Sequence, residues 1–147
     1  MGERIPIGAD HAGFALKERL VRELQTLGYE PVDVGTHSTE STDYPDYAHP
    51  VADQVSRGEV QRGVLLCGTG LGMAYAANRH HGVRAAVVGN TEIARLAREH
   101  NDANVLVLPA RFVSEDEGVA ILKTWLDTPF AGGRHQRRVE KIETETT

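Results

Sequence analysis

Residues 63–73 read GVLLCGTGLGM, and their pattern indicates the class of fold most directly. Its first four residues are a short apolar run that begins at a glycine, which is typical of a buried β-strand. Three glycines within residues 68–72 then predict a turn, and a helical pattern continues over residues 70–78. A buried strand that passes through a tight glycine turn directly into a helix is the repeating unit of a parallel α/β sheet.

The same alternation of apolar runs and helical patterns extends over the rest of the chain. Strands are predicted at residues 4–8, 31–34, 63–66, 83–88 and 105–108, and helices at 13–27, 47–57, 70–78, 91–99 and 114–126, with a charged helix or tail at 133–144. The polar segment 35–45 is expected to be a long loop at a strand end. Parallel strands with right-handed crossovers and helices on both faces form a Rossmann-like three-layer αβα sandwich, and 147 residues fit one such α/β domain, 1–147, with a C-terminal helical tail.

The composition argues against several classes of function. A net charge of −5, 5% aromatic residues and the lack of a long basic run argue against a nucleic-acid partner. No apolar run approaches the roughly 18 residues of a membrane span, and residues 1–10 resemble neither a signal peptide nor a transit peptide. The single cysteine excludes an internal disulfide, and a free thiol stays reduced most easily in the cytoplasm, where we expect this protein.

Cys67 follows the third predicted strand, at the edge of a parallel sheet where ligands bind. The backbone N–H groups of residues 68–72 are able to point at one place, and the N-terminus of the next helix adds partial positive charge, so this loop favours an anion. The same surroundings favour the thiolate, which makes Cys67 a candidate base or nucleophile. Alternatively, Cys67 is a small buried apolar residue.

Familiar anion-binding motifs fit this loop poorly. Met73 occupies the position of the third glycine of a dinucleotide-binding loop, and also that of the phosphate-binding arginine of a small cysteine phosphatase. No lysine follows the glycines, as a nucleotide-binding P-loop requires. We therefore expect the loop to hold an anion that develops during a reaction, such as an enolate oxygen.

Three other polar groups have both a functional and a structural interpretation. Asp10-His11 follows the first strand, where the aspartate alternatively caps a helix. His100-Asn101 lies at the end of a predicted helix, where both residue types are common caps. Arg134 and Arg138 are one helical turn apart, so they form either a fork suited to a phosphate or part of a solvated tail.

Six motifs occur in one order along the chain: GADHAGF at residues 8–14, TDYPDYA at 42–48, LCGTGLGM at 66–73, AAN at 76–78, HNDANVL at 100–106 and GGRHQRR at 132–138. Together they resemble the ribose-5-phosphate isomerase B family and its sugar-phosphate isomerase relatives. The resemblance covers nearly the whole chain, and six motifs in the same order are far more specific than any one of them.

The resemblance implies an isomerase that opens the sugar ring and moves a proton between C1 and C2 through a cis-enediolate, with no metal and no other cofactor. Cys67 matches the base, and Thr69 matches a hydroxyl contact in the enediolate anion hole. His100, helped by Asp10, matches the ring-opening pair. The remaining matches are substrate contacts: the anion hole at Gly68, Gly70, Leu71 and Gly72, the phosphate clamp of His11, Arg111, Arg134 and Arg138, and the sugar contacts Tyr44 and Asn101.

The resemblance also implies a homodimer, or a tetramer built from dimers, in which each active site takes residues from both subunits. His100, Asn101 and Arg111 are expected to come from the partner. The family includes enzymes for ribose 5-phosphate, tetrose 4-phosphates, allose 6-phosphate and galactose 6-phosphate, the last with two unlike subunits, so the substrate stays open. A non-catalytic sugar-phosphate-binding module is the alternative outside enzymes, and it would not need Cys67.

Overall fold

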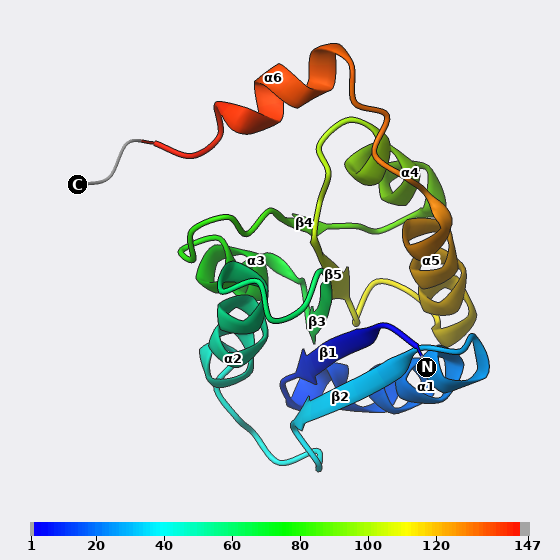
Figure 1. The fold of residues 1–147 in the computed structure, drawn as a ribbon. Helices are drawn as coiled ribbons and strands as arrows, with labels where there is room; N and C mark the ends of the chain where they lie inside the picture. The colour runs from blue at the N-terminus through cyan, green and yellow to red at the C-terminus, as the bar shows by residue number, and fades with distance from the viewer. Residues whose placement is uncertain (1, 145–147) are drawn as a thin grey trace.

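The computed structural model describes residues 2–144, which form one parallel β-sheet with helices on both faces (Figure 1). The strands are β1 (Arg4–Ala9), β2 (Glu30–Gly35), β3 (Gly63–Cys67), β4 (Ala85–Val87) and β5 (Val105–Pro109). Every strand pair is parallel, and the order across the sheet is β2-β1-β3-β5-β4. The five predicted strands are confirmed, although β4 is shorter than the predicted 83–88. It begins late because the N–H of Arg84 donates to the side-chain oxygen of Asn104 at 2.7 Å.

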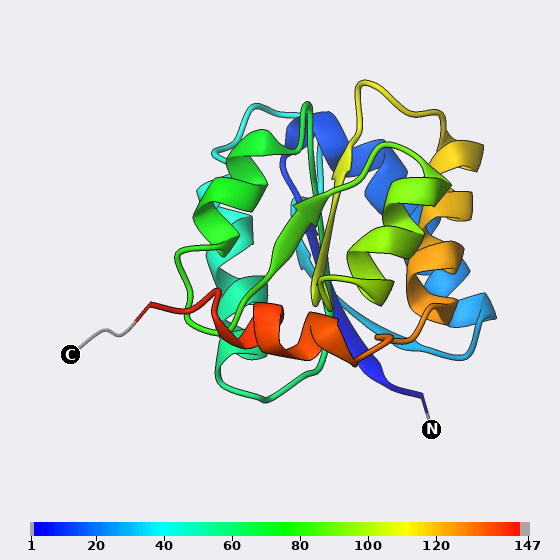
Figure 2. The ribbon, with the colours of Figure 1, turned by 90° about the horizontal axis from the view of Figure 1, so that it is seen from above.

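The helices of the described residues fall into two layers. They are the 3-10 helix η1 (His11–Gly13) and the α-helices α1 (Phe14–Thr26), α2 (Pro45–Ser56), α3 (Leu71–Ala77), α4 (Thr91–Glu99), α5 (Glu115–Asp127) and α6 (Arg134–Glu140). Helices α1, α4 and α5 cover one face of the sheet and α2 and α3 cover the other (Figure 2), so the predicted single-domain αβα sandwich is confirmed. Helix α2 begins two residues earlier than predicted, because Pro45 fits the first helical turn, where no N–H donor is needed.

Alternate residues of β3 face opposite layers, as the period of a strand requires. Val64 and Leu66 belong to the apolar core under α1, α4 and α5, whereas Leu65 and Cys67 belong to the core under α2 and α3. All residues of β3 are buried, which explains its continuous apolar run at the centre of the sheet. Cys67 therefore lies on the α2 and α3 side, at the carboxyl end of the central strand.

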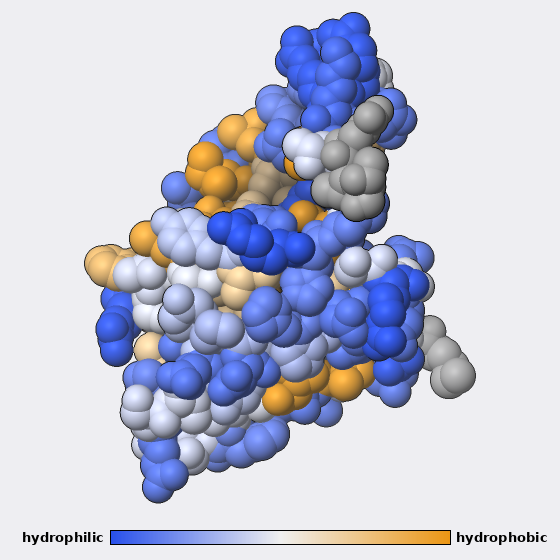
Figure 3. Space-filling model, turned by 90° about the vertical axis from the view of Figure 1, so that its left-hand side faces the viewer, coloured by the Kyte–Doolittle hydropathy of each residue, from blue (hydrophilic) through white to orange (hydrophobic). Residues whose placement is uncertain are grey.

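The C-terminal segment forms a short surface helix. Helix α6 has no buried residue, and it projects beyond the β4 side of the sheet (Figure 1), toward the end where the strands begin (Figure 2). The ring of His135 stacks on that of His100 with 4.3 Å between centroids, and the carboxylate of Glu143 accepts a hydrogen bond of 2.8 Å from the N–H of Gly82. Figure 3 shows apolar residues gathered beneath this projecting segment, where a cavity of about 490 Å³ includes Ala85, Ala86 and Ile142 in its lining.

No helix within residues 2–144 combines the length and the apolar character that a membrane span requires.

Candidate active site

The carboxyl ends of β1, β3 and β5 lie side by side and form the floor of the candidate site. Ala9 pairs with Leu66 in register, and Cys67 pairs with Pro109. Beyond these pairs, the N–H of Asp10 donates to the carbonyl of Leu66 at 3.2 Å, and the N–H of Ala110 donates to the carbonyl of Cys67 at 2.9 Å. The structure therefore brings Asp10, His11 and the Cys67 loop to one edge, as the parallel order predicts.

The loop after Cys67 combines a buried thiol with exposed backbone donors. Cys67 is 4% exposed. Gly70, which precedes α3, has a φ of +80°, a conformation that favours glycine. The hydroxyl oxygen of Thr69 accepts from the N–H of Leu71 at 3.2 Å, so its own hydrogen is left to donate. Among the hydrogen bonds of residues 2–144, none uses the N–H of Thr69 or Gly70, which suits both groups to a bound anion.

Two glycines of this loop leave room for side chains that close over it. A Cβ on Gly68 would lie 3.1 Å from Nη1 of Arg111, and a Cβ on Gly72 would lie 2.5 Å from Cε1 of Tyr44. The guanidinium of Arg111 and the ring of Tyr44 thus contact the loop from the same chain. We expected Arg111 to reach the site from a partner subunit, but in this structure Arg111 lies beside the Cys67 loop of its own chain. Its N–H also donates to the carbonyl of Gly68 at 3.0 Å, which fixes the backbone of Arg111 next to that loop.

Asp10 and His11 are held by backbone groups. Asp10 is 6% exposed, and its Oδ1 accepts from the N–H groups of Ala12 at 3.0 Å and Gly13 at 3.3 Å, so the capping interpretation is confirmed. Nδ1 of His11 accepts from the N–H of Thr42 at 3.1 Å. In its neutral form His11 therefore carries the hydrogen on Nε2, where it serves as a donor toward a ligand.

His100 and Asn101 lie at the opposite end of the sheet, where the strands begin. His100 ends α4, where its N–H donates to the carbonyl of Leu96 at 2.9 Å, which agrees with the capping interpretation. The five residues of β5 separate this turn from Arg111, which amounts to about 17 Å at the rise of a strand. Within one chain, His100 and Asn101 are therefore too far from Cys67 to act on the same small molecule.

The two arginines of α6 lie with His100 and not with Cys67. Arg134 and Arg138 belong to the same short helix, which contains the His135 that stacks on His100 and lies beyond β4, toward the end of the sheet where the strands start (Figures 1 and 2). The structure thus divides the predicted phosphate clamp. His11 and Arg111 lie at the carboxyl edge, and Arg134 and Arg138 lie at the other edge.

Three residues that the sequence did not single out support the two sets of site residues, the one around Cys67 and the one around His100. The backbone of Thr42 orients His11, the ring of His135 covers His100, and Asp102 follows the His100-Asn101 turn with two arginines bound to its carboxylate. His135 and Asp102 both lie within the quoted motifs, but nothing in a linear pattern states which side chain they contact.

None of the cavities described within residues 2–144 has Cys67 in its lining. A cavity of about 520 Å³ lies where the strands begin and includes Arg62, Arg84 and Arg98 in its lining. A shallower one of about 260 Å³ includes Tyr44 and Gly72, beside the Cys67 loop. Within residues 2–144, no group of three or more His, Cys, Asp or Glu side chains is arranged to hold a metal ion.

Comparisons with known proteins agree over almost the whole chain. A sequence model of the ribose/galactose isomerase family matches residues 5–142. Ribose-5-phosphate isomerase B of Escherichia coli is 47% identical over 140 residues, which cover 95% of this chain and 94% of that protein. A ribose 5-phosphate isomerase of Thermotoga maritima has a crystal structure that superposes with a TM-score of 0.93 at 51% identity, covering 97% of this chain and 98% of that one. Ribose-5-phosphate isomerase B of Mycoplasma genitalium, solved with bound ribulose 5-phosphate, gives a TM-score of 0.91 at 44% identity, covering 95% and 93% of the two chains.

Proposed function

The chain belongs to the ribose/galactose isomerase family, and from this membership we propose that it interconverts ribose 5-phosphate and ribulose 5-phosphate as an aldose–ketose isomerase. The observation that carries the proposal is the juxtaposition at the carboxyl edge. A buried thiol, a glycine loop with free N–H donors and a guanidinium follow neighbouring parallel strands. A carbon acid needs a base and a stabilised oxyanion, and this edge offers both.

Ring opening is the first step of the proposed reaction. His100 accepts the proton of the C1 hydroxyl and passes it to the ring oxygen, so that the C1–O bond of the ring breaks and a free aldehyde forms. Asp10 assists this step from the other subunit. General acid–base catalysis of this kind requires groups within hydrogen-bond reach of both oxygens.

Proton transfer follows on the open chain. The Cys67 thiolate takes the proton from C2, and the resulting cis-enediolate places its negative oxygen against the N–H groups of Thr69 and Gly70 in the glycine loop. Cys67 returns the proton to C1, and the hydroxyl of Thr69 relays the O2 proton to O1, which leaves the C2 ketone. No electron acceptor is needed, because one carbon is oxidised as its neighbour is reduced.

A second copy of the chain completes the site in this proposal. His100 and Asn101 act on the substrate that lies over the partner's Cys67, and Arg134 and Arg138 join His11 and Arg111 around its phosphate. The division of these residues between two edges of one sheet supports a homodimer with shared sites, since a two-fold pair brings opposite edges together twice. The same proposal places the protein in the cytoplasm and its reaction in the pentose phosphate pathway.

The substrate is tested with the purified protein and four-, five- and six-carbon aldose phosphates in deuterated water, after treatment with EDTA. We expect fastest turnover of ribose 5-phosphate, deuterium at C1 of the ketose, and no effect of the chelator. A preference for tetrose 4-phosphate, allose 6-phosphate or galactose 6-phosphate would change the substrate but keep the chemistry. Binding without isotope exchange would favour a non-catalytic sugar-phosphate-binding module.

The shared site is tested by mixing two inactive variants. In a mixed dimer of Cys67→Ser and His100→Asn, one site carries both changes and the other carries neither. Random mixing in equal amounts should therefore restore about a quarter of the wild-type activity. The absence of any restored activity, with subunit exchange confirmed by mass spectrometry, would contradict the shared site.

A further inference from the structure

Asp102 has an unusual backbone at the turn between α4 and β5. Its φ is +50°, and it is the one non-glycine residue within 2–144 that has a positive φ. Aspartate and asparagine tolerate this left-handed conformation better than other side chains, yet it is still disfavoured. Such a conformation persists where surrounding contacts impose it. The contacts around Asp102 are therefore expected to have a purpose beyond joining two elements.

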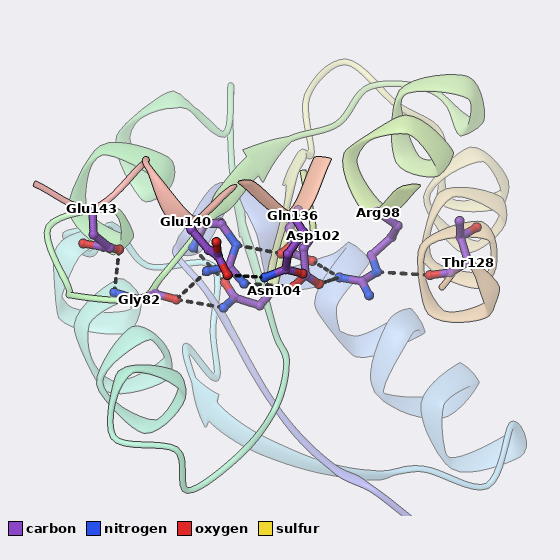
Figure 4. Close-up of polar contacts among 10 residues, drawn as sticks. Gly82, Arg98, Asp102, Asn104, Thr128, Gln136, Glu140 and Glu143 are labelled. Atoms are coloured by element: carbon purple, nitrogen blue, oxygen red, sulfur yellow. Dashed lines mark hydrogen bonds and ion pairs between the residues drawn. The ribbon is translucent and has the colours of Figure 1, made fainter. Parts of the chain in front are cut away.

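Arg84 and Arg98 both bind the carboxylate of Asp102, and Figure 4 shows the side chain of Arg98 extending toward Asp102. Its Oδ1 accepts from Nη1 of Arg98 at 2.8 Å, and its Oδ2 accepts from Nη2 of Arg84 at 3.3 Å. The backbone carbonyl of Asp102 also accepts from Nε of Arg84 at 2.9 Å, and its N–H donates to the carbonyl of Arg98 at 3.2 Å. Side chain and backbone are thus fixed together.

The same two arginines tie the turn to the body of the protein. Arg98 is 9% exposed, and it donates to the carbonyls of Ala103 at 2.7 Å and Thr128 at 3.1 Å. Arg84 donates to the carbonyl of Gly82 at 3.3 Å. Two guanidinium groups share one carboxylate here, so the loss of that carboxylate would leave two positive charges facing each other with nothing between them.

His100 and Asn101 lack such support of their own. The only described side-chain contact of His100 is the stacked ring of His135, from the exposed helix α6, and the side chain of Asn101 is exposed. The direction in which both side chains point is therefore set by the backbone, and the fixed residue next to them is Asp102.

We propose that Asp102, held in a left-handed conformation by Arg84 and Arg98, is a positioning residue that aims His100 and Asn101 at the substrate. The inference rests on the proposed function, since it assigns to the turn a part in ring opening. Asp102 itself touches no reacting atom. Its loss should impair the step that needs His100 and spare the proton transfer at Cys67.

The two steps are separable with one carbon skeleton. Ribulose 5-phosphate cannot close a furanose ring, because its C5 oxygen carries the phosphate. Exchange of its C1 hydrogen with deuterated water therefore reports proton transfer alone, whereas consumption of ribose 5-phosphate also requires ring opening. For Asp102→Asn, which keeps the shape and the tolerance for positive φ, we expect kcat on ribose 5-phosphate to fall about tenfold or more, and the exchange rate of ribulose 5-phosphate to change by less than about threefold.

A second variant separates the effect of the carboxylate contacts with Arg84 and Arg98 from the effect of the strained backbone. Asp102→Gly accepts the positive φ without strain and keeps the backbone contacts with Arg84 and Arg98, but it has no carboxylate for the two guanidinium groups, so it should show the same selective loss. Arg84→Lys, which keeps the charge and loses the forked contact, should show a weaker version and remain testable if the Asp102 variants unfold. Asp53→Asn, which removes a carboxylate that pairs with Arg57 at 3.0 Å on the surface, is the control and should behave as wild type.

Each outcome has one meaning. Equal losses on both assays, or wild-type ribose 5-phosphate turnover in Asp102→Gly, would overturn the positioning role and leave the proposed function intact. Wild-type protein that catalyses neither reaction would overturn the proposed function itself. A His100→Asn variant without selective loss would remove the ring-opening assignment on which the positioning role depends.

Discussion

The guanidinium of Arg111 lies directly over the backbone of Gly68, so close that a Cβ on this glycine would come within 3.1 Å of Nη1. The contact joins the residue after β5 to the residue after β3 across the edge of the sheet. It places a positive charge one residue from Cys67, where the proposed reaction develops an anion.

Gly68→Ala should therefore displace Arg111 without unfolding the protein. The nearest atoms belong to the far end of a flexible side chain, so a shift of the guanidinium relieves the contact. We expect kcat/KM for ribose 5-phosphate to fall about tenfold and the melting temperature to change by less than about 2 °C. Gly89→Ala is the matched control, because a Cβ there meets nothing within 4 Å. Equal activity of the two variants would show that the position of Arg111 does not matter.

Cys67→Ser should leave substrate binding nearly intact and lower turnover about 100-fold or more, because a hydroxyl has a much higher pKa than a thiol and no longer serves as the base. The exchange of the C1 hydrogen of ribulose 5-phosphate should fall by the same factor, since it requires only this proton transfer. Steady-state kinetics and NMR of the exchange measure the two rates. A serine variant with near wild-type turnover would rule out Cys67 as the base.

His100→Asn should separate ring opening from proton transfer. We expect a loss of about 100-fold in turnover of ribose 5-phosphate, with exchange into ribulose 5-phosphate nearly unchanged. If His100 only caps α4, the variant should instead lose about 1 kcal/mol or less of stability and affect both assays alike. Melting temperature, measured beside the two assays, distinguishes these cases.

The stack of His135 on His100 predicts a dependence of stability on pH. Partial burial lowers the pKa of His135, and the neighbouring His100, Arg134 and Arg138 lower it further, whereas Glu99 opposes the shift. The folded protein then binds fewer protons than the unfolded chain, so the free energy of unfolding decreases as the pH falls below the ordinary histidine value of about 6.5 and levels off below the lowered pKa. Thermal unfolding between pH 8 and pH 5 measures this decrease.

His135→Gln is the variant that tests the assignment. It keeps a polar side chain on α6 and removes the titrating group, so its melting temperature should fall less than that of the wild type over the same pH range. Parallel curves for the two proteins would show that other groups cause the acid destabilisation.

The fold was largely predictable because its signals are local. The five strands of the described chain were found from their apolar runs, and the helices from their apolar stripes and their caps. The errors lie at element ends, where a side chain replaces a backbone partner, as Asn104 does beside β4. The grouping of Asp10, His11 and Cys67 also followed from the sequence, because all three come directly after strands of one parallel sheet.

Local sequence was enough to predict the order of strands and helices, the glycine turn after Cys67 and the residue types at both ends of the sheet, since each depends on neighbours within a few positions. Which side chains meet became known from the tertiary structure. The N–H of Thr42 reaches His11 across 31 positions, and Arg84 reaches Asp102 across 18. It also placed Arg111 on Gly68 of its own chain, and His100 at the far edge from Cys67. These relations depend on how distant segments pack, because a linear pattern contains the period of each element but not the distances between elements.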